Sequence, residues 1–373
     1  MNVVETAADG SFTLPGHERE RFIFITTPSG YKTFNRHYHK IEEKQSGYDF
    51  GLMPYSGRIR KDGSHKYIHI ADTEIFNTEN HEDWVNNVRD YARNEQAAFI
   101  IHTGDICYEK GLKAHIKLMN TENMDCPVFY CIGNHDLVKG KYGEELFESI
   151  YGPVYYSFDA GNVHYIVTPM PGGDHAPGYT ADDVCRWLKN DLAHIRPGTP
   201  VVVFNHDLLT YEDAFIFKSK NAGSINLNEH NLKAWVYSHW HINYMKKQGD
   251  VYSVCTSSLD KGGIDHSTTA FRVMHVDSKG DFTSELRYTY LDKNICIASP
   301  AGVMASGVLP VAVNVYSSVS PVKEVLYTCL ADGKPVLKNK RLLQSTDWSW
   351  NGELPLSDKY VGRSLTLLVT ARF

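Results

Sequence analysis

Five short polar segments carry side chains that bind metal ions, and each follows an apolar stretch of strand length. The segments occur in this order along the chain: Asp72–Glu74, Gly104–Tyr108, Gly133–Asp136, Asn205–Asp207 and Ser238–His241. Their carboxylate, amide and imidazole groups are ligands that suit Mn²⁺, Fe or Zn²⁺. The sequence therefore predicts a metal site built from these five segments.

The number of donors in these segments favours two metal ions over one. Three histidines, two aspartates and one asparagine exceed what a single catalytic ion needs, because such an ion keeps one coordination position open. The same donors suit two ions about 3.5–4 Å apart. Two cations at that separation repel each other, so we expect one aspartate to touch both. Gly104 and Gly133 permit tight turns directly after their strands.

The elements that must position these segments form an α/β region that begins near Lys66. Apolar runs of strand length alternate there with helical patterns, as in βαβ units. One helix is expected after a cap at Thr78, and another opens with a capping box at 180–183. Strands are expected at 67–71, 97–102, 126–132, 200–204 and 233–237. In open α/β sheets, ligands bind beyond the carboxyl ends of the strands, where the polar segments lie.

The first 64 residues read as a β-sandwich-like domain of short strands and turns. Strands are expected at 3–6, 11–14 and 21–27. Because the first of these begins almost at Met1, we expect that earlier strands of this domain are missing from the chain. The α/β domain is then expected to span residues 65–293.

The end of the chain returns to alternating strands. We expect a small C-terminal β-sandwich at residues 296–373. Its predicted strands are 311–316, 325–329 and 364–371, and its predicted turns are Asp332-Gly333 and Asn351-Gly352.

The overall composition excludes several classes of protein. The chain has 373 residues, of which 42% are hydrophobic and 22% charged, and 38 basic against 44 acidic residues give a formal charge of −6. This balance excludes a disordered chain and a basic face that binds nucleic acid irrespective of sequence. No apolar run reaches the length of a membrane-spanning helix.

The ordered motifs resemble those of the calcineurin-like metallophosphoesterases, over roughly residues 66–290. The resemblance implies a four-layer αββα core with a dinuclear metal centre of Mn, Fe or Zn and a small phosphate-ester substrate. The flanks look like the two β-sandwich domains of one bacterial subgroup, which implies an exported, periplasmic protein. The chain as given opens without the basic and apolar segments of a signal peptide.

The resemblance also assigns a role to each motif residue. It implies that His135 is the catalytic histidine and that Asp136 orients it. The implied metal ligands are Asp72 and His241 for the first ion, Asp105 as the bridge, and Asn134, His206 and His239 for the second ion.

Three positions depart from the family pattern. Glu74 stands where the family usually has histidine; as position i+2 of a strand it shares a face with Asp72, so it could reach the first metal or hold a bound water. Tyr108 stands where many members have a second aspartate. The pattern Gly-Asp-x-x-Tyr is similar to that of the purple acid phosphatases, in which this tyrosine binds iron, so Tyr108 is either a metal ligand or a rim or packing residue. Ser238 replaces the glycine that normally precedes His239.

The resemblance implies hydrolysis of phosphate mono- or diesters by attack of a metal-bound hydroxide, with His135 protonating the leaving oxygen. Both ester classes stay open, because room for a second substituent depends on loops. The alternative is a non-catalytic binding or adhesion protein with a degenerate phosphoesterase core, which Glu74 and Ser238 allow.

Only four of the 18 histidines are assigned in this way. Two others, His175 and His266, lie in loops 171–178 and 257–268, which could overhang the site and contact substrate. We expect four more to be ordinary core or surface residues: His69, His102, His164 and His275.

Overall fold

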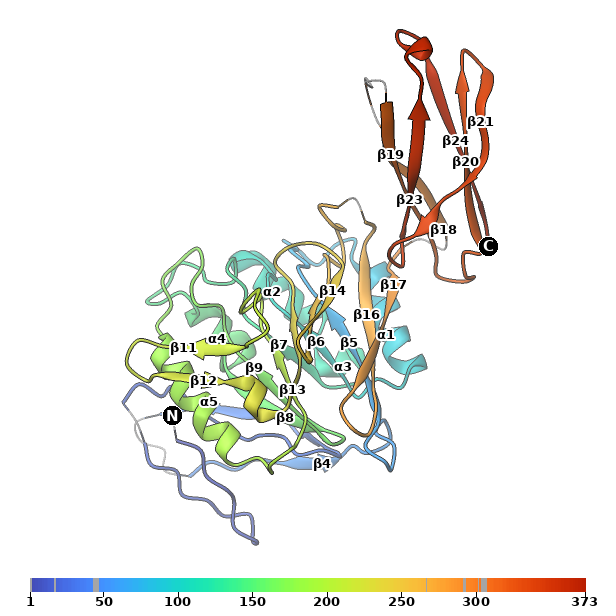
Figure 1. Ribbon diagram of the computed structural model, residues 1–373. Helices are drawn as coiled ribbons and strands as arrows, with labels where there is room; N and C mark the ends of the chain where they lie inside the picture. Colours follow the sequence, from blue (N-terminus) through green and yellow to red (C-terminus); the bar gives the residue numbers. More distant parts are fainter. Residues whose placement is uncertain are drawn as a thin grey trace. The chain divides into compact units, whose positions relative to one another are not determined.

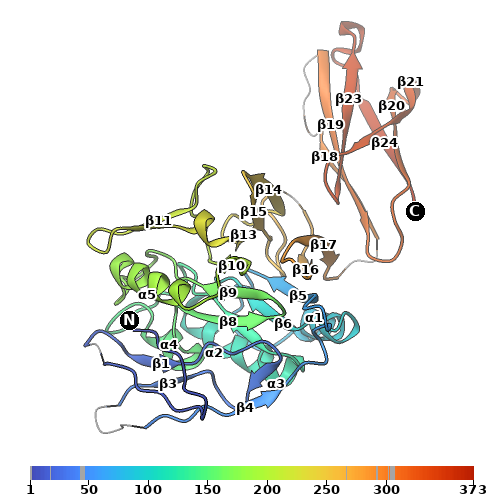
Figure 2. The same cartoon turned by 60° about the horizontal axis from the view of Figure 1, so that its bottom comes forward.

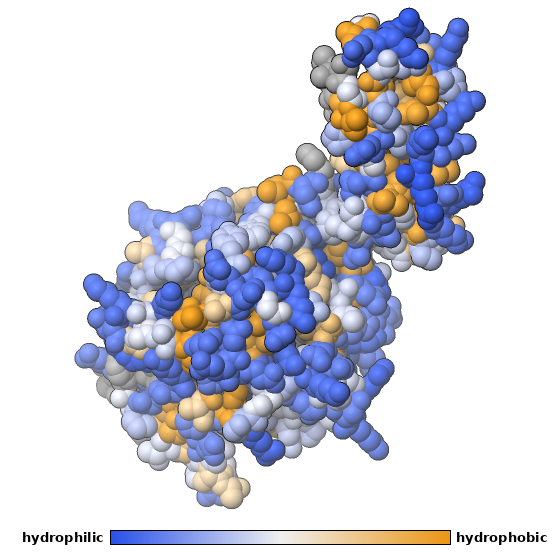
Figure 3. Space-filling view, viewed as in Figure 1, coloured by the Kyte–Doolittle hydropathy of each residue, from blue (hydrophilic) through white to orange (hydrophobic). Residues whose placement is uncertain are grey.

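The computed structural model describes residues 2–16, 18–42, 47–265, 267–290, 293–300, 302 and 307–373. The chain divides into two units, residues 1–264 with 269–285 and residues 265–268 with 286–373 (Figure 1). Within the described residues, no helix has both the length and the apolar character needed to span a membrane. The face drawn in Figure 3 is mainly hydrophilic, with small hydrophobic areas on both units.

Two mixed β-sheets form the centre of the first unit (Figures 1 and 2). The five-stranded sheet has the order β17 (Phe282–Tyr288), β16 (Ala270–Val276), β5 (His65–Ile70), β6 (Phe99–His102) and β7 (Val128–Tyr130). The six-stranded sheet has the order β14 (Tyr244–Gln248), β15 (Val251–Cys255), β13 (Leu232–Tyr237), β10 (Val201–Phe204), β9 (Val163–Val167) and β8 (Tyr156–Ala160).

The five strands predicted for this region are β5, β6, β7, β10 and β13. In the five-stranded sheet, β5, β6 and β7 run parallel to one another. In the six-stranded sheet, β10 and β13 run parallel to each other and to their neighbours β9 and β15. The carboxyl ends of neighbouring parallel strands therefore lie at one edge of each sheet.

Side chains alternate between the two faces of each sheet, and both faces are buried. In β6, Phe99 packs between the sheets, whereas Ile100 packs on the outer side among helix residues. In β10, Phe204 faces the other sheet and Val203 packs on the outer side with Trp187 of α5 (Ala181–Ala193). Burial on both faces explains the near-continuous apolar runs of these strands.

Helices cover the outer faces of both sheets, which confirms the predicted αββα arrangement. Four of them contribute to the cluster outside the five-stranded sheet: α1 (Glu82–Asn94), α2 (Tyr108–Leu118), α3 (Thr121–Met124) and α4 (Glu145–Tyr151). On the other side, α5 opens with the predicted capping box of Thr180 and Asp183.

The prediction of a cap at Thr78 is wrong, because α1 begins after His81. Asn80, at φ +62°, interrupts a right-handed helical path between the two positions.

The N-terminal residues add two short ladders to the first unit. These are β1 (Phe22–Phe24) with β3 (Tyr38–Lys40), and β2 (Tyr31–Thr33) with β4 (Leu52–Pro54). A further ladder pairs β11 (Ile216–Lys218) with β12 (Ser224–Asn226), followed by a 3₁₀ turn at Leu227–His230. The strands predicted at 3–6 and 11–14 do not form, because most side chains there are exposed and have no sheet face to cover.

The second unit consists of two antiparallel sheets around one core. The first sheet is β18 (Lys293–Ser299), β19 (Gly307–Ser317), β23 (Ser349–Leu356) and β22 (Leu343–Gln344), and the second is β21 (Lys334–Arg341), β20 (Glu324–Ala331) and β24 (Leu365–Arg372). Val313, Tyr327 and Trp350 from these sheets meet in the core. A 3₁₀ turn lies at Asp358–Tyr360.

One of the two predicted turns of the second unit is present. Asp332 and Gly333, both at positive φ, connect β20 to β21. The turn predicted at Asn351-Gly352 is wrong, because both residues lie within β23 and Gly352 pairs with Val311. The neighbouring Trp350 is buried in the core, which favours a strand that continues past the Asn-Gly pair.

Candidate metal centre

The loops after five parallel strands bring the predicted site residues to one place. Three of these strands belong to the five-stranded sheet and two to the six-stranded sheet. The loops after β5, β6 and β7 carry Asp72 and Glu74, Asp105, and Asn134 to Asp136, and those after β10 and β13 carry His206, His239 and His241.

One cluster of possible ligands surrounds His206. Ligand atoms of Asp105, His206 and His239 lie within 4.8 Å of one another. Nε2 of His206 is 3.1 Å from Oδ2 of Asp105 and 3.1 Å from Oδ1 of Asn134. Nδ1 on the other side of the ring is 2.8 Å from the carbonyl oxygen of Thr103, an acceptor, so Nδ1 donates there. This bond leaves Nε2 as the nitrogen that can bind a metal ion.

A second cluster surrounds His241. Its Nε2 lies 3.6 Å from Oδ1 of Asp72 and 3.4 Å from Oε1 of Glu74. Ligand atoms of Glu74 and Asp105 also fall within 4.8 Å of each other, together with Cys107. Asp105 is therefore within ligand distance of Glu74 in the second cluster as well as of His206 and His239 in the first.

Asp72 provides a test of whether a cation fits. Its side chain is fully buried, and among the described residues neither of its carboxylate oxygens has a side-chain hydrogen-bond partner, although the backbone of His239 lies close enough to lower its pKa slightly against the effect of burial. A buried carboxylate is costly unless it is paired or coordinates a metal ion. The residues present therefore fit a bound cation beside Asp72 and His241.

The pKa values of the candidate ligands are shifted because several buried carboxylates lie close together. Although burial opposes protonation, Asp105 and Asp72 raise the pKa of His206 to about 9. Burial raises the pKa of Asp72 well above its usual range. Burial and the charge of His206 lower the pKa of His239. A proton on His206 thus balances negative charge that a metal ion can balance instead.

The backbone around the two clusters is strained in a consistent way. Seven residues other than glycine have φ between +46° and +74°: Asp72, Glu74, Asp105, Cys107, Tyr108, His239 and His241. Each costs about 1–2 kcal/mol relative to a right-handed conformation. A Cβ atom at Gly133 would lie 2.2 Å from Oδ1 of Asp105, so glycine is required where this loop passes the carboxylate. Such clusters of strain are characteristic of functional sites.

The comparison with known protein families agrees with this geometry. The family model described as calcineurin-like phosphoesterase matches residues 65–243. Residues 65–243 are thus similar to the calcineurin-like phosphoesterases, and we call this matched region the phosphoesterase domain. The match supports a metal-dependent phosphoesterase and implies divalent metal ions. No curated protein sequence matches the chain.

Several solved structures resemble this phosphoesterase domain. A structure described as a novel archaeal phosphodiesterase is 12% identical, with 60% of this chain and 99% of that chain covered and a TM-score of 0.30. Phosphopantetheinyl hydrolase from Mycobacterium tuberculosis is 13% identical, with 53% and 91% covered and a TM-score of 0.33. Vacuolar protein sorting 29 from Cryptosporidium parvum is 10% identical, with 78% and 98% covered and a TM-score of 0.32.

His135 and Asp136 of the phosphoesterase domain occupy different environments. Nδ1 of His135 lies 2.8 Å from Oδ2 of Asp174, and both side chains are about one-third exposed. Asp136 is fully buried, and its two oxygens accept hydrogen bonds from the backbone N–H groups of Cys107 (2.8 Å) and Gly133 (2.9 Å). The structure therefore differs from the expectation that Asp136 orients His135, because the carboxylate that contacts this ring belongs to Asp174.

The three departures from the family pattern have distinct surroundings. Oε2 of Glu74 pairs with Nζ of Lys261, while its Oε1 faces His241. The Ser238 hydroxyl lies 2.9 Å from Nδ1 of His206 and donates to the Thr103 carbonyl oxygen at 2.9 Å, which adds a contact that holds the imidazole. The ring of Tyr108, which is 44% exposed, lies beside that of His135 with centroids 5.3 Å apart.

Sequence reasoning singled out loops 171–178 and 257–268 as neighbours of the site but not the residues that contact it. In loop 171–178 the side chain that contacts the site is Asp174, whereas His175 is exposed. In loop 257–268 it is Lys261, and His266 lies outside the described residues. An acidic residue next to His175 was the available signal, although a loop sequence does not indicate which neighbour faces inward.

Two of the histidines expected to be ordinary core residues are buried and form hydrogen bonds away from the proposed metal ligands. His69 contacts the hydroxyl groups of Thr103 and Thr256, each at 2.8 Å. His102 contacts the hydroxyl of Thr73 at 3.1 Å. His102 also accepts a hydrogen bond from the backbone N–H of Gly104 at 3.1 Å, and His164 pairs instead with the carboxylates of Asp159 and Asp191. None of these contacts involves a proposed metal ligand.

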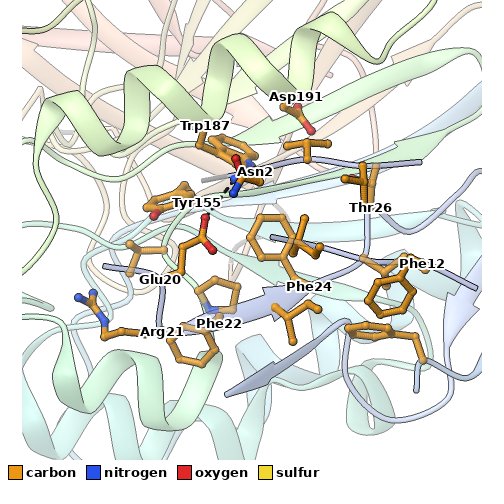
Figure 4. Close-up of a pocket in the computed structure, with 18 of the residues that line it drawn as sticks. Asn2, Phe12, Glu20, Arg21, Phe22, Phe24, Thr26, Tyr155, Trp187 and Asp191 are labelled. Carbon is orange, nitrogen blue, oxygen red and sulfur yellow. Dashed lines mark hydrogen bonds between the residues drawn. The ribbon is translucent and has the colours of Figure 1, made fainter. Parts of the chain in front are cut away.

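A cavity of about 770 Å³ lies elsewhere in the first unit, between the N-terminal residues and α5 (Figure 4). The aromatic rings of Phe24, Tyr155 and Trp187 line it. Its charged groups include a pair between Arg19 and Asp183 at 2.7 Å. The described residues that line this cavity include none of the proposed ligands, so its size does not mark the phosphoesterase site.

Proposed function

We propose that this protein hydrolyses phosphate mono- or diesters with two metal ions bound between the two sheets. The observation that carries the proposal is the membership of Asp105 in both ligand clusters. A carboxylate in that position can bridge two cations and reduce their mutual repulsion. The family match to residues 65–243 supports the same class of chemistry.

The first ion would be held by Asp72 and His241, with Glu74 as an additional candidate. The oxygens of buried Asp72, which have no side-chain hydrogen-bond partner among the described residues, support this assignment. The second ion would be held by Asn134, His206 and His239, and the anchored ring of His206 supports it. Tyr108 stays a candidate ligand as well as a rim residue.

When bound, two such ions would supply a water molecule of lowered pKa and positive charge for the phosphate oxygens. The residues of the chain would provide the rest. Nδ1 of His135 is engaged by Asp174, so Nε2 is the ring nitrogen that can hold a proton for the leaving oxygen. Proton transfer of this kind contributes typically about 10²–10⁴-fold. Asp136 would act through the backbone, because it ties the loops that carry Asp105 and His135.

Metal analysis combined with an aryl phosphate assay tests the proposal. We expect the full chain, reconstituted with Mn²⁺, Fe²⁺ or Zn²⁺, to bind two equivalents and to release phosphate. His135→Ala should keep both ions and lose most turnover. One equivalent of metal in an active protein would overturn the dinuclear assignment, and unchanged turnover in His135→Ala would overturn the role of the histidine.

The ion pair of Glu74 with Lys261 is the observation that favours the second candidate. In this reading, the lysine neutralises a carboxylate that would otherwise bind metal, and the domain is a non-catalytic binding or adhesion protein. Less than one equivalent of metal, with no turnover in added Mn²⁺, would support this candidate and overturn the first.

A further inference from the structure

Two exposed aromatic rings lie together beside the candidate metal centre. Phe76 is 54% exposed and Tyr108 is 44% exposed, although both are large apolar side chains. Their ring centroids are 6.3 Å apart and the planes differ by 15°, so the rings are nearly parallel. We call this pair the aromatic platform. Because both rings remain largely in contact with water, they bury little apolar surface. The platform therefore contributes little to the stability of the fold.

The platform is continuous with the site on two sides. The backbone N–H of Tyr108 donates to the carbonyl oxygen of His135 at 3.1 Å, and the two rings have centroids 5.3 Å apart. Phe76 follows Glu74 by two residues, and Nζ of Lys261 lies 5.7 Å from the centroid of the Phe76 ring. The rings therefore lie between the proposed proton-donating histidine and the Glu74–Lys261 pair.

This position decides which part of a substrate can reach the platform. The phosphate group has to lie at the metal ligands, and the leaving oxygen has to lie near His135. The group attached to that oxygen then extends toward Tyr108, which is the aromatic neighbour of His135. A flat, uncharged ring at that point can stack on exposed aromatic faces, whereas a small alkyl or polyol group cannot.

We propose that Phe76 and Tyr108 select phosphate esters whose alcohol portion carries a planar aromatic ring, such as an aryl group or a nucleobase. The inference rests on the proposed phosphoesterase function and adds the class of leaving group. Phe76 contributes an exposed face, and its described ring contacts are with Tyr108 and Lys261 rather than with a metal ligand of the assigned sets. Tyr108 contributes the second face and connects the platform to His135 through its backbone.

Non-hydrolysable phosphonates separate ring recognition from chemistry. The metal-loaded full chain is titrated with phenylphosphonate and with methylphosphonate, and the ratio of the two dissociation constants is compared among variants. We expect Phe76→Ala to lower the preference for the phenyl compound about tenfold, which corresponds to about 1.4 kcal/mol and lies within the range measured for stacking on an aromatic side chain. Methylphosphonate binding should stay unchanged.

Two further variants serve as controls. Phe76→Tyr keeps a ring and should keep the preference. Phe34→Ala removes an aromatic side chain that is 67% exposed and lines cavities away from the site, so it should leave both dissociation constants unchanged. Far-ultraviolet circular dichroism of the three variants verifies that each is folded.

The outcomes distinguish this inference from the function on which it rests. An unchanged preference in Phe76→Ala, with both phosphonates binding, would overturn the platform and leave the phosphoesterase proposal intact. An equal loss of both ligands in Phe76→Ala would assign Phe76 a general structural role and also overturn the platform. Failure of both phosphonates to bind the unsubstituted protein, together with no hydrolysis of any ester, would overturn both proposals.

Discussion

Asp174 contacts the ring of His135 through a 2.8 Å approach of Oδ2 to Nδ1, across 39 positions of sequence. The carboxylate belongs to a loop between β9 and α5, whereas the imidazole belongs to the loop after β7. The contact opposes the effect of burial and raises the pKa of His135. Asp174 is therefore a positioning residue for the proposed proton donor.

Replacing Asp174 with asparagine should lower kcat by about 10- to 100-fold, a part of the 10²–10⁴-fold that proton transfer contributes. Because Asp174 raises the pKa of His135, its removal should move the alkaline limb of the kcat profile to lower pH. Metal content should stay unchanged. An unshifted limb with normal kcat would show that Asp174 does not act on the reaction.

The Asp105→Asn substitution should cause loss of bound metal in a protein that stays folded. Amide oxygen is a weaker ligand than carboxylate, and Asp105 lies in both clusters. Substitution of a residue that only contacts a metal ligand typically lowers metal affinity about 10–100-fold. We expect Asp105→Asn to lower it by more than this. Metal analysis after gel filtration measures the loss, with Asp207→Asn as the matched control, because Asp207 contacts Trp240 and is not a proposed ligand. Two retained equivalents in Asp105→Asn would contradict the bridging role.

The Gly133→Ala substitution should destabilise the domain and weaken metal binding together. Its Cβ would lie 2.2 Å from Oδ1 of Asp105 and 2.3 Å from the Asp105 backbone nitrogen. Overpacking of this kind costs about 1–3 kcal/mol. Gly172→Ala is the control, since no described atom lies within 4 Å of its added Cβ. Urea denaturation measures both variants, and equal stabilities would contradict the close approach.

His164 should make the stability of the metal-loaded protein fall as pH rises. Burial opposes its protonation, but Asp159 and Asp191, at 2.7 and 2.9 Å, raise its pKa to about 9. The unfolded chain has the ordinary value near 6.5. The stabilisation is therefore complete below pH 6.5 and lost through about pH 9, and it amounts to on the order of 3 kcal/mol.

Urea denaturation of the native chain and of His164→Gln between pH 6 and pH 10 measures this contribution. The difference in unfolding free energy between the two should shrink as pH rises, because glutamine does not titrate. A constant difference across this range would mean that His164 does not change its protonation in the folded state.

The central fold was predictable because its strands can be recognised from short stretches of sequence. The strands before Asp72 and Asp105 are buried on both faces and rich in apolar residues, and their ends are marked by polar residues and Gly104. The strands predicted at 3–6 and 11–14 failed because alternation predicts a strand only where a partner and a buried face exist. The residues of these two segments form no strand ladder, although Val3, Phe12 and Leu14 are half-buried.

The gathering of the candidate ligands at one place was predictable, whereas the residues that contact them were not. Asp72 and His241 lie directly after strands, and the order of the strands brings them together. Asp174 and Lys261 lie in irregular loops, where backbone geometry decides which side chain faces inward. The role of Asp136 was misassigned for a similar reason, because its partners are backbone N–H groups that a sequence pattern does not distinguish.

The proposed ligands come from both sheets, and this has a mechanical consequence. Asp72, Asp105 and Asn134 extend from the five-stranded sheet, whereas His206, His239 and His241 extend from the six-stranded sheet. A pair of ions held by both sets would act as a cross-link between two layers that otherwise meet through apolar contacts, such as Tyr67 with Phe204, and a few hydrogen bonds, such as His69 with Thr256. A chelator would then act as a denaturant of one edge of the sandwich as well as an inhibitor.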